Sequence, residues 1–419
     1  MNLIIKTLAG LEDVLAAELA AIGAEEIVAG KRAVQCAGDL RLMYRANLEL
    51  RTALRVLKPI RQFEASNETE FYDQIKAIDW SAYLDVNDTL AVDAVAHSKV
   101  FTHSQYVALK TKDAIVDQFR ERTGFRPGVD TENPRLRINV HISNTACSVS
   151  LDSSGESLHK RGYRTEGLTA PINEALAAGM ILLSGWKGDC AFIDPMCGSG
   201  TLVIEAAMYA MRIPPQLYRE DFAFMRWADF DPLLWADVRT NARAEMRTVH
   251  FPILGFDKNF QAVQASEANA KAARLEGKVR FDRRRFETLT PVAEKGILMM
   301  NLSYDVRITD NHIEGLYEMI GDRLKKAFPG YDAWIISANQ EALKHLGLRP
   351  SRKIPLFNGA LECRFIKLEL YEGTRKFSRD RPLSPEQKEA GPIPKTRQRK
   401  FSPREDTRGF PKREDQDKP

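Results

Sequence analysis

Hydrophobic and polar positions in the first part of the chain recur at two spacings, which predict short helices and strands in alternation. Within residues 11–22, apolar side chains recur three or four positions apart, the spacing of a helix that buries one face. Gly23 can end that helix. The same reasoning predicts two strands and a second helix, at residues 26–28, 33–36 and 40–48. Residues 1–55 are therefore expected to form a small α+β unit.

Residues 56–155 show the same alternation and predict a second α+β unit. Its expected elements are a strand, an amphipathic helix and two paired strands, at residues 90–96, 107–120, 136–142 and 146–151. The polar triplet at residues 143–145 forms the turn between the paired strands.

From residue 171 onward, apolar strands alternate with helices. A helix is expected to run through residue 183, and strands follow at residues 191–194, 253–257, 279–281, 296–300 and 333–337. A hairpin with Asn358-Gly359 at its turn closes the series. This alternation predicts an open, doubly wound α/β sheet, which binds ligands beyond the carboxyl ends of its strands.

Length and composition narrow the class of protein. A chain of 419 residues with 44% hydrophobic content is expected to form two or three globular domains. No apolar run approaches the roughly 20 residues of a membrane span, and the first residues lack the features of a signal peptide. The five cysteines are scattered, and the seven histidines have no ligand spacing. We therefore expect a cytoplasmic protein without a metal site.

Positive charge is concentrated at the C-terminus. Residues 373–419 carry 14 Lys/Arg and 8 Asp/Glu, a net charge of +6, whereas the preceding 372 residues carry 47 and 49, a net charge of −2. With seven prolines and almost no apolar periodicity, this tail is expected to be disordered. Either it adds weak, salt-sensitive affinity for RNA, or it is an inert solubilising end.

A glycine-rich turn follows the strand at residues 191–194. It reads Asp194-Pro195-Met196-Cys197-Gly198-Ser199-Gly200-Thr201 and opens into a helix. The dinucleotide-binding pattern would need a third glycine where Val203 stands, and a phosphate-binding loop would need Gly-Lys-Ser/Thr. The glycines let a ligand approach the backbone closely, and an acid at the strand end repels phosphate but holds an ammonium group. S-adenosylmethionine is a cationic ligand of this kind.

This turn closely resembles the first motif of class I methyltransferases, in the form found in RNA guanine-N2 methyltransferases. The resemblance implies a Rossmann-like methyltransferase domain that uses S-adenosylmethionine. It assigns cofactor contacts to Asp194, Pro195, Cys197, Gly198, Gly200 and Thr201. The alternative is a strand-to-helix turn that holds no ligand.

Further cofactor contacts are expected from two other segments. Asp257 ends the second strand, where a carboxylate can accept hydrogen bonds from two adjacent ribose hydroxyls. In similar enzymes the segment that contains Pro171 and Asn173 covers the cofactor. Similar enzymes also carry an acid that reads the adenine amino group, but Arg285 stands at that position here. Adenine recognition would then pass to a backbone group or to a neighbouring side chain.

The fourth strand leads into Asn301-Leu302-Ser303-Tyr304, which resembles the Asn/Asp-Pro-Pro-Tyr motif of amino-methyltransferases. An exocyclic base amine is a poor nucleophile because its lone pair is delocalised into the ring. The Asn301 side-chain oxygen and the Leu302 carbonyl can accept both N–H groups and turn the lone pair toward a methyl donor. Tyr304 is expected to stack on the extruded base.

Both prolines of that motif are absent here. Leu302 and Ser303 replace them, so the required atoms remain but the fixed backbone does not. A leucine at the first position also occurs in the corresponding motif of rRNA adenine dimethyltransferases. We expect an active enzyme, and the alternative is a degenerate site that binds RNA without methylating it.

The N-terminal units resemble RNA-recognition modules. Residues 104–117, 149–152 and 158–164 resemble parts of the THUMP domain, an RNA-binding module that follows a ferredoxin-like domain in similar enzymes. RNA contacts are expected from the helix and from the cationic linker, at Lys110, Lys112, Lys160, Arg161, Tyr163 and Arg164. The alternatives are a solvated helix face and a linker packed at the domain junction. An aromatic-rich insertion near residues 211–250 is expected to be core rather than binding surface.

Together these features predict five segments: a ferredoxin-like domain, a THUMP domain, a linker, a class I methyltransferase domain and a basic tail, at residues 1–55, 56–155, 156–170, 171–372 and 373–419. The predicted activity is methylation of guanine N2 in large-subunit rRNA, with no obligate protein partner. The alternatives are methylation of guanine N2 in tRNA, a non-catalytic RNA-binding factor in ribosome assembly and, as a minor option, methylation of adenine N6.

Overall fold

Two β-sheets organise the residues that the computed structural model describes, which are 1–165, 172–302 and 310–373. Both sheets belong to the unit Met1–Glu372. The predictions for Pro171, for Ser303 and Tyr304, and for the tail beyond residue 373 lie outside the described residues.

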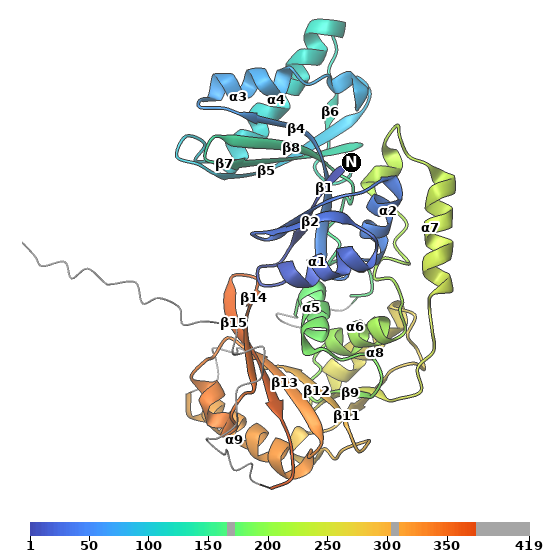
Figure 1. Cartoon of the computed structure of the whole chain (residues 1–419), viewed down its shortest axis with the longest axis vertical. Helices are drawn as coiled ribbons and strands as arrows, with labels where there is room; N and C mark the ends of the chain where they lie inside the picture. The colour runs from blue at the N-terminus through green and yellow to red at the C-terminus, as the bar shows by residue number, and fades with distance from the viewer. Residues whose placement is uncertain (166–171, 303–309, 374–419) are drawn as a thin grey trace, which may run out of the picture. The chain divides into compact units, whose positions relative to one another are not determined.

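The first sheet contains the N-terminal strands in the order β2-β3-β1-β4-β8-β7-β5-β6. In chain order these strands are β1 (Asn2–Thr7), β2 (Glu25–Gly30), β3 (Ala33–Ala37), β4 (Ala53–Glu64), β5 (Thr89–His97), β6 (Gly128–Val129), β7 (Leu136–Ser143) and β8 (Ala146–Asp152). Its helices are α1 (Glu12–Ala21), α2 (Leu40–Glu49), α3 (Glu68–Lys76) and α4 (Ser104–Thr123), with a short 3-10 helix η1 (Trp80–Ala82). Figure 1 shows α3 and α4 on one face of the strands β4, β8, β7 and β5.

The predicted N-terminal elements are confirmed to within a few residues. The helix expected at 11–22 is α1, and Gly23 follows it with a φ of +87°, a backbone conformation that glycine adopts without strain. The expected hairpin is the antiparallel pair β7–β8, in which Ser143 faces Ala146 across the turn.

One long strand, β4, joins the two N-terminal units. Its first half pairs with β1, and its second half pairs with β8. The domain boundary that we placed between residues 55 and 56 therefore falls inside a strand. Two modules that resemble separate domains share one continuous sheet.

The second sheet has the order β11-β10-β9-β12-β13-β15-β14. Its strands are β9 (Ala191–Asp194), β10 (Ile253–Asp257), β11 (Arg280–Arg283), β12 (Gly296–Asn301), β13 (Tyr331–Ser337), β14 (Arg352–Asn358) and β15 (Leu361–Glu369). Strands β9 to β13 pair in parallel, whereas β15 runs antiparallel to both β13 and β14. The predicted α/β sheet and its closing hairpin are confirmed.

Helices cover both faces of this sheet, as a doubly wound fold requires. They are α5 (Glu174–Ser184), α6 (Thr201–Ala210), α8 (Phe260–Ala272) and α9 (Asp310–Ala327), with the 3-10 helices η3 (Phe286–Thr288) and η4 (Ala342–Leu346). Helix α7 (Pro232–Ala244) and the 3-10 helix η2 (Ala223–Arg226) belong to the insertion and pack in the N-terminal core instead. Successive residues of a strand enter opposite cores: Met299 of β12 packs in the cluster with α5 and α6, and Leu298 and Met300 pack in the cluster with α9. Because β12 lies beside β9, the carboxyl ends of these two strands meet at one edge of the sheet.

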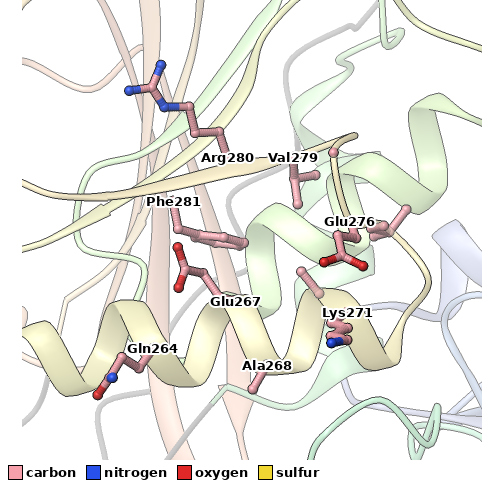
Figure 2. A pocket seen from close by; sticks show the side chains of 11 residues that line it. Gln264, Glu267, Ala268, Lys271, Glu276, Val279, Arg280 and Phe281 are labelled. Atoms are coloured by element: carbon pink, nitrogen blue, oxygen red, sulfur yellow. The ribbon is translucent and has the colours of Figure 1, made fainter.

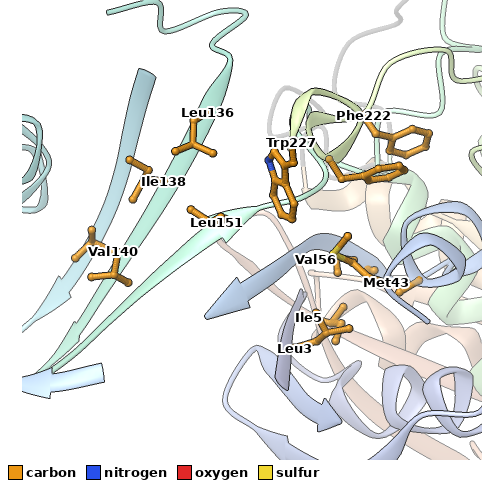
Figure 3. Packing of buried hydrophobic residues seen from close by; sticks show 14 of the residues in the cluster. Leu3, Ile5, Met43, Val56, Leu136, Ile138, Val140, Leu151, Phe222 and Trp227 are labelled. Carbon is orange, nitrogen blue, oxygen red and sulfur yellow. The ribbon is translucent and has the colours of Figure 1, made fainter. Parts of the chain in front are cut away.

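The aromatic-rich insertion is part of a core, as expected, but that core belongs to the N-terminal region. The Tyr44 ring of α2 lies 4.6 Å from the Phe224 ring and 5.8 Å from the Trp235 ring, measured between centroids. Figure 3 shows Phe222 and Trp227 of the insertion in one cluster with residues of the first sheet. The insertion thereby attaches the second sheet's domain to α2.

Candidate active site

The turn after β9 is held by three hydrogen bonds, two to β10 and one from α8. The Cys197 N–H donates to the Phe256 carbonyl of β10 at 2.9 Å, and the Gly198 N–H donates to Asp257 Oδ2 at 3.1 Å. From α8, the Ser266 hydroxyl donates to the Gly198 carbonyl at 2.7 Å. The turn is therefore fixed before any ligand arrives.

Two glycines in this turn have positive φ angles but different surroundings. Gly198 has a φ of +53°, and a Cβ atom built there would meet nothing within 4 Å. Gly200 has a φ of +81°, and its Cβ would lie 3.0 Å from both Phe281 Cζ and Ser266 Cβ. Gly200 thus allows α6 to begin against α8 and β11, whereas Gly198 borders open space that a ligand can enter.

Asp194 ends β9 with its side chain 2% exposed. One carboxyl oxygen accepts a hydrogen bond from the Met196 N–H at 3.1 Å. Burial, with a smaller contribution from the neighbouring Asp257 carboxylate, raises the pKa of Asp194 to about 8, although the Met196 N–H opposes this shift. A buried acid with a raised pKa gains from a cationic partner, which the ammonium group of S-adenosylmethionine would supply.

Asp257 ends β10, and each of its carboxylate oxygens accepts one backbone N–H. Gly198 donates to Oδ2, and Asn259 donates to Oδ1 at 2.8 Å. Because each carboxylate oxygen can accept a second hydrogen bond, both can still bind the hydroxyls of a ribose. The residues of β9 and β10 therefore fit S-adenosylmethionine, with Asp194 suited to the amine and Asp257 to the ribose.

The other predicted cofactor residues of this region have structural partners. The side chains of Pro195, Cys197 and Thr201 are buried, so they shape the turn. Burial raises the pKa of the Cys197 thiol well above its usual value, which keeps the thiol neutral. The Asn173 oxygen caps α5 by accepting the N–H groups of Ala175 and Leu176. Direct cofactor contacts of these four side chains remain predictions.

Asn301 and Leu302 stand at the end of β12, close to the end of β9. Leu298 pairs with Ile193, so Asn301 extends about two residues, roughly 7 Å, beyond Asp194 along the same edge. The Leu302 side chain is 1% exposed in the core, and its N–H donates to the Ile336 carbonyl of β13 at 3.2 Å. A proline has no N–H and could not form this bond. Burial and pairing therefore fix the backbone at Leu302, where related motifs use a proline ring.

Comparisons with known proteins show which family the chain resembles. Three family models match the chain: the RlmL ferredoxin-like domain at residues 2–57, the THUMP domain at 65–152, and the RMKL-like methyltransferase domain at 161–367. A putative RNA methyltransferase of Synechocystis sp. is 39% identical over 364 residues, which cover 86% of this chain and 95% of that protein. The chain belongs to this family of THUMP-containing methyltransferases.

Longer relatives and solved structures extend the comparison. The ribosomal RNA large subunit methyltransferase K/L of Syntrophotalea carbinolica is 39% identical over 389 residues, covering 90% of this chain and 54% of that protein. The chain thus spans about half the length of the relatives of that name. A crystal structure of a putative methyltransferase complexed with SAH has a TM-score of 0.80 at 30% identity, covering 89% of this chain and 99% of that one.

The linker before the methyltransferase domain corrects part of our RNA-contact prediction. Arg161 and Tyr163 are buried, and both contact the Glu205 carboxylate of α6, at 3.5 Å and 3.0 Å. Arg161 also donates to the carbonyls of Leu158 and Arg51. These two side chains are therefore unable to reach RNA in this structure, because they fasten the linker to the domain.

Arg164 continues this attachment next to the cofactor turn. It forms an ion pair with Glu174 of α5 at 2.8 Å, and it donates to Thr201 Oγ1 at 3.2 Å and Ser199 Oγ at 3.4 Å. Arg164 therefore helps to hold the helix start after Gly200; its side chain is 23% exposed, and its RNA contact stays a prediction. Lys160 is exposed and pairs with Glu156 at 2.6 Å, so its RNA contact stays a prediction.

The two predicted lysines of the THUMP helix α4 are half-buried. Lys110 Nζ lies 5.4 Å from the centroid of the Tyr72 ring, and Lys112 pairs with Asp113. Neither arrangement requires or excludes RNA, and both contacts stay predictions.

Arg285 is exposed on the loop that follows β11, at the edge where adenine would lie. The nearest preceding acid, Asp282, pairs with Arg280 at 2.8 Å and with Arg284 at 3.9 Å.

A cavity of about 510 Å³ lies away from the predicted site, between α8 and β11. Its lining includes Glu267 and Lys271 of α8 and Arg280 and Phe281 of β11, and Figure 2 shows the Phe281 ring on the side of the strand that faces Glu267. None of the predicted cofactor or catalytic residues lines it. Among the described residues, no cluster of His, Cys, Asp or Glu is arranged to hold a metal ion, and no helix is both long and apolar enough to cross a membrane.

Proposed function

We propose that this protein transfers the methyl group of S-adenosylmethionine to the exocyclic N2 of a guanine in large-subunit ribosomal RNA. The observation that carries the proposal is the meeting of two strand ends. Asp194 and the Gly198 turn follow β9, and Asn301 extends beyond them from the adjacent β12. The names of the rRNA relatives support the choice of RNA.

In this proposal the chain acts by binding and orienting both partners. Asp194 pairs with the cofactor amine, Asp257 binds the ribose hydroxyls, and the open space beside Gly198 admits the cofactor. The bound cofactor supplies an electrophilic methyl group. Asn301 accepts one N–H of the base amine and the Leu302 carbonyl accepts the other, so that the amine nitrogen directs its lone pair at the methyl.

No residue is needed to remove a proton before transfer. Methylation leaves a positive charge on the amine nitrogen, and the resulting cation loses its proton readily to water. Catalysis therefore depends on positioning and on the electrostatic effect of the two oxygen acceptors. The described end of β12 supplies such acceptors, the Asn301 amide and the Leu302 carbonyl.

Nucleoside mass spectrometry of rRNA and tRNA, from cells with and without the gene, tests the proposal. Loss of N2-methylguanosine from the large rRNA alone is the expected result. Loss from tRNA would move the substrate, and loss of N6-methyladenosine would change the base. If cells without the gene keep every modification, the proposed activity is contradicted.

A matched pair of variants connects the activity to the site. With purified protein and an rRNA transcript, Asn301→Ala is expected to lower kcat by about 10²- to 10³-fold, because one acceptor of the amine is lost. Its calorimetric affinity for S-adenosylmethionine should not change. Asp194→Asn should instead weaken cofactor binding. If neither variant differs from the natural protein, the assigned edge is not the active site.

A further inference from the structure

Phe125 is the most exposed aromatic side chain among the described residues, with 72% of its surface accessible. It follows the C-terminal end of α4 in the THUMP domain. Large apolar side chains are normally withdrawn from water when the fold allows it. An aromatic ring at this level of exposure contributes little to the core.

The backbone that presents this ring is ordered by hydrogen bonds on both sides. Gly124 takes a φ of +78° and donates its N–H to the Arg120 carbonyl at 2.9 Å, which ends the helix. The Phe125 N–H donates to Thr123 Oγ1 at 3.2 Å. Three residues later the chain joins the sheet, where Gly128 of β6 pairs with Thr89 of β5. The ring is thus displayed by a fixed turn.

The cavity beside the ring has a cationic lining. This cavity of about 590 Å³ is lined by Val86, Asn87, Arg120, Gly124, Phe125 and Arg126. This lining contains two arginines and no carboxylate. The Arg120 side chain is 52% exposed, and its contact with Asp117 is long, at 3.5 Å. Such a surface suits an anionic ligand that offers a flat ring.

The other end of α4 provides a contrast. Tyr106 is also exposed, at 42%, but its hydroxyl donates to the Glu68 carboxylate at 2.6 Å. The cavity beside it is lined by Glu68 and by no lysine or arginine. An exposed aromatic occurs at both ends of the helix, and of the two cavities only the one at Phe125 is lined by arginines.

We propose that Phe125, Arg120 and Arg126 form a stacking site for an unpaired RNA nucleotide. The ring would stack on the base, and the two guanidinium groups would contact the flanking phosphates. A duplex offers no free base face, so the occupant is single-stranded. This inference rests on the proposed RNA substrate and adds where on the THUMP domain that substrate is held.

The test uses the full chain and a 12-nucleotide single-stranded RNA that carries fluorescein and one 5-iodouridine. Fluorescence anisotropy measures affinity, and ultraviolet crosslinking followed by mass spectrometry identifies the stacked residue. Phe125→Ala is expected to weaken binding about 5- to 100-fold, which corresponds to the loss of one stacked base. Tyr106→Ala, the matched control, should remain within twofold of the natural protein.

A charge variant tests one of the two arginines. Arg126→Gln should reduce the slope of log affinity against log salt by about 0.7, because one phosphate contact is lost. Arg122→Gln is the control, since Arg122 already pairs with Asp79 at 2.7 Å. The crosslink is expected at Phe125.

Unchanged affinity of Phe125→Ala, or a crosslink mapped elsewhere, would overturn the stacking site. So would failure of the natural protein to bind this probe. Methylation of an rRNA transcript by the natural protein is measured in parallel. If methylation persists while the Phe125 results fail, only the stacking site is wrong. If methylation is absent, the proposed function is wrong.

Discussion

At the scale of single residues, the Asp194 carboxyl makes stability depend on pH. Its pKa of about 8 in the folded protein lies above the usual value near 3.8. The folded state therefore holds a proton between about pH 4 and pH 8 that the unfolded state has released. Stability falls as the pH rises through this window, by an amount on the order of 5 kcal/mol at most.

Replacing this acid by a neutral amide should remove its part of the dependence. We expect Asp194→Asn to unfold at a higher urea concentration than the natural protein at pH 8.5, and to differ little from it at pH 5. Urea unfolding curves at the two pH values measure the difference. Asp189→Asn, an exposed acid before the same strand, should show no such change. Equal curves for Asp194→Asn and the natural protein at pH 8.5 would contradict the assignment.

The two glycines of the turn should respond differently to alanine. Both have positive φ, which costs an alanine about 1–2 kcal/mol. Only at Gly200 would the new Cβ also crowd Phe281 and Ser266. Gly200→Ala should therefore lose about 1–3 kcal/mol more unfolding free energy than Gly198→Ala.

For cofactor affinity, we expect the reverse of the order found for stability. The Cβ of Gly198→Ala enters the open space assigned to the ligand, so this variant should bind the cofactor more weakly although it loses less stability. Chemical denaturation and calorimetric titration with S-adenosylmethionine measure the two quantities. A Gly198→Ala variant that binds normally would place the ligand elsewhere.

At the scale of elements, the ion pair between the linker and α6 is a buried attachment. Arg161 and Glu205 have side chains 1% and 0% exposed, and burial raises the pKa of Glu205 against the opposing effect of Arg161. Arg161→Leu should lower the unfolding free energy by about 3–5 kcal/mol, because a buried acid loses its partner. Arg161→Leu combined with Glu205→Leu should recover much of this loss.

A surface pair provides the comparison. Breaking the pair between Arg41 and Asp237, which are 44% and 48% exposed, should cost at most about 1 kcal/mol. Denaturant unfolding of the single and double variants gives the coupling energy of each pair. Similar values for the two pairs would show that the linker is not anchored as described. If RNA affinity at low salt falls while stability does not, the original RNA-contact prediction for Arg161 would be restored.

Sequence reasoning succeeded where the signal is local. The turn after β9 is a contiguous motif, and the helices α1 and α2 show regular apolar spacing. The strand β4 was not predicted because Pro59 interrupts the sequence pattern of a strand, and a register shift occurs between Pro59 and Arg61. Helix α3 was not predicted, although its two buried residues, Phe71 and Ile75, have the same spacing as Leu15 and Leu19 of α1.

Contacts between distant residues were beyond sequence reasoning. Glu205 is 44 positions from Arg161, and from sequence an acid on a helix is expected to lie at the surface. The cationic linker therefore resembled an RNA-binding segment. The same limit explains why the aromatic insertion was expected in a core but without its partner Tyr44.

At the scale of the whole molecule, the basic tail should affect RNA binding without affecting the fold. The hydrophobic clusters of the described residues contain nothing beyond Leu370. A chain ending at Glu372 should keep its melting temperature and lose a net charge of +6. Its slope of log RNA affinity against log salt should fall by at most about 4.

Thermal unfolding and RNA binding at several salt concentrations measure both effects. A tail in which each cation is exchanged for glutamine is the control for length. An unchanged salt slope would identify the tail as an inert end. A lower melting temperature would mean that the tail contributes to folding.

The shared strand β4 has a consequence for how this protein can have evolved. A gene break between codons 55 and 56 would cut that strand and leave both fragments with an unpaired sheet edge, a site of aggregation. The two N-terminal modules are therefore expected to fold well only when they are kept on one chain. An exchange of modules between relatives that moves residues 1–152 as one block leaves β4 intact.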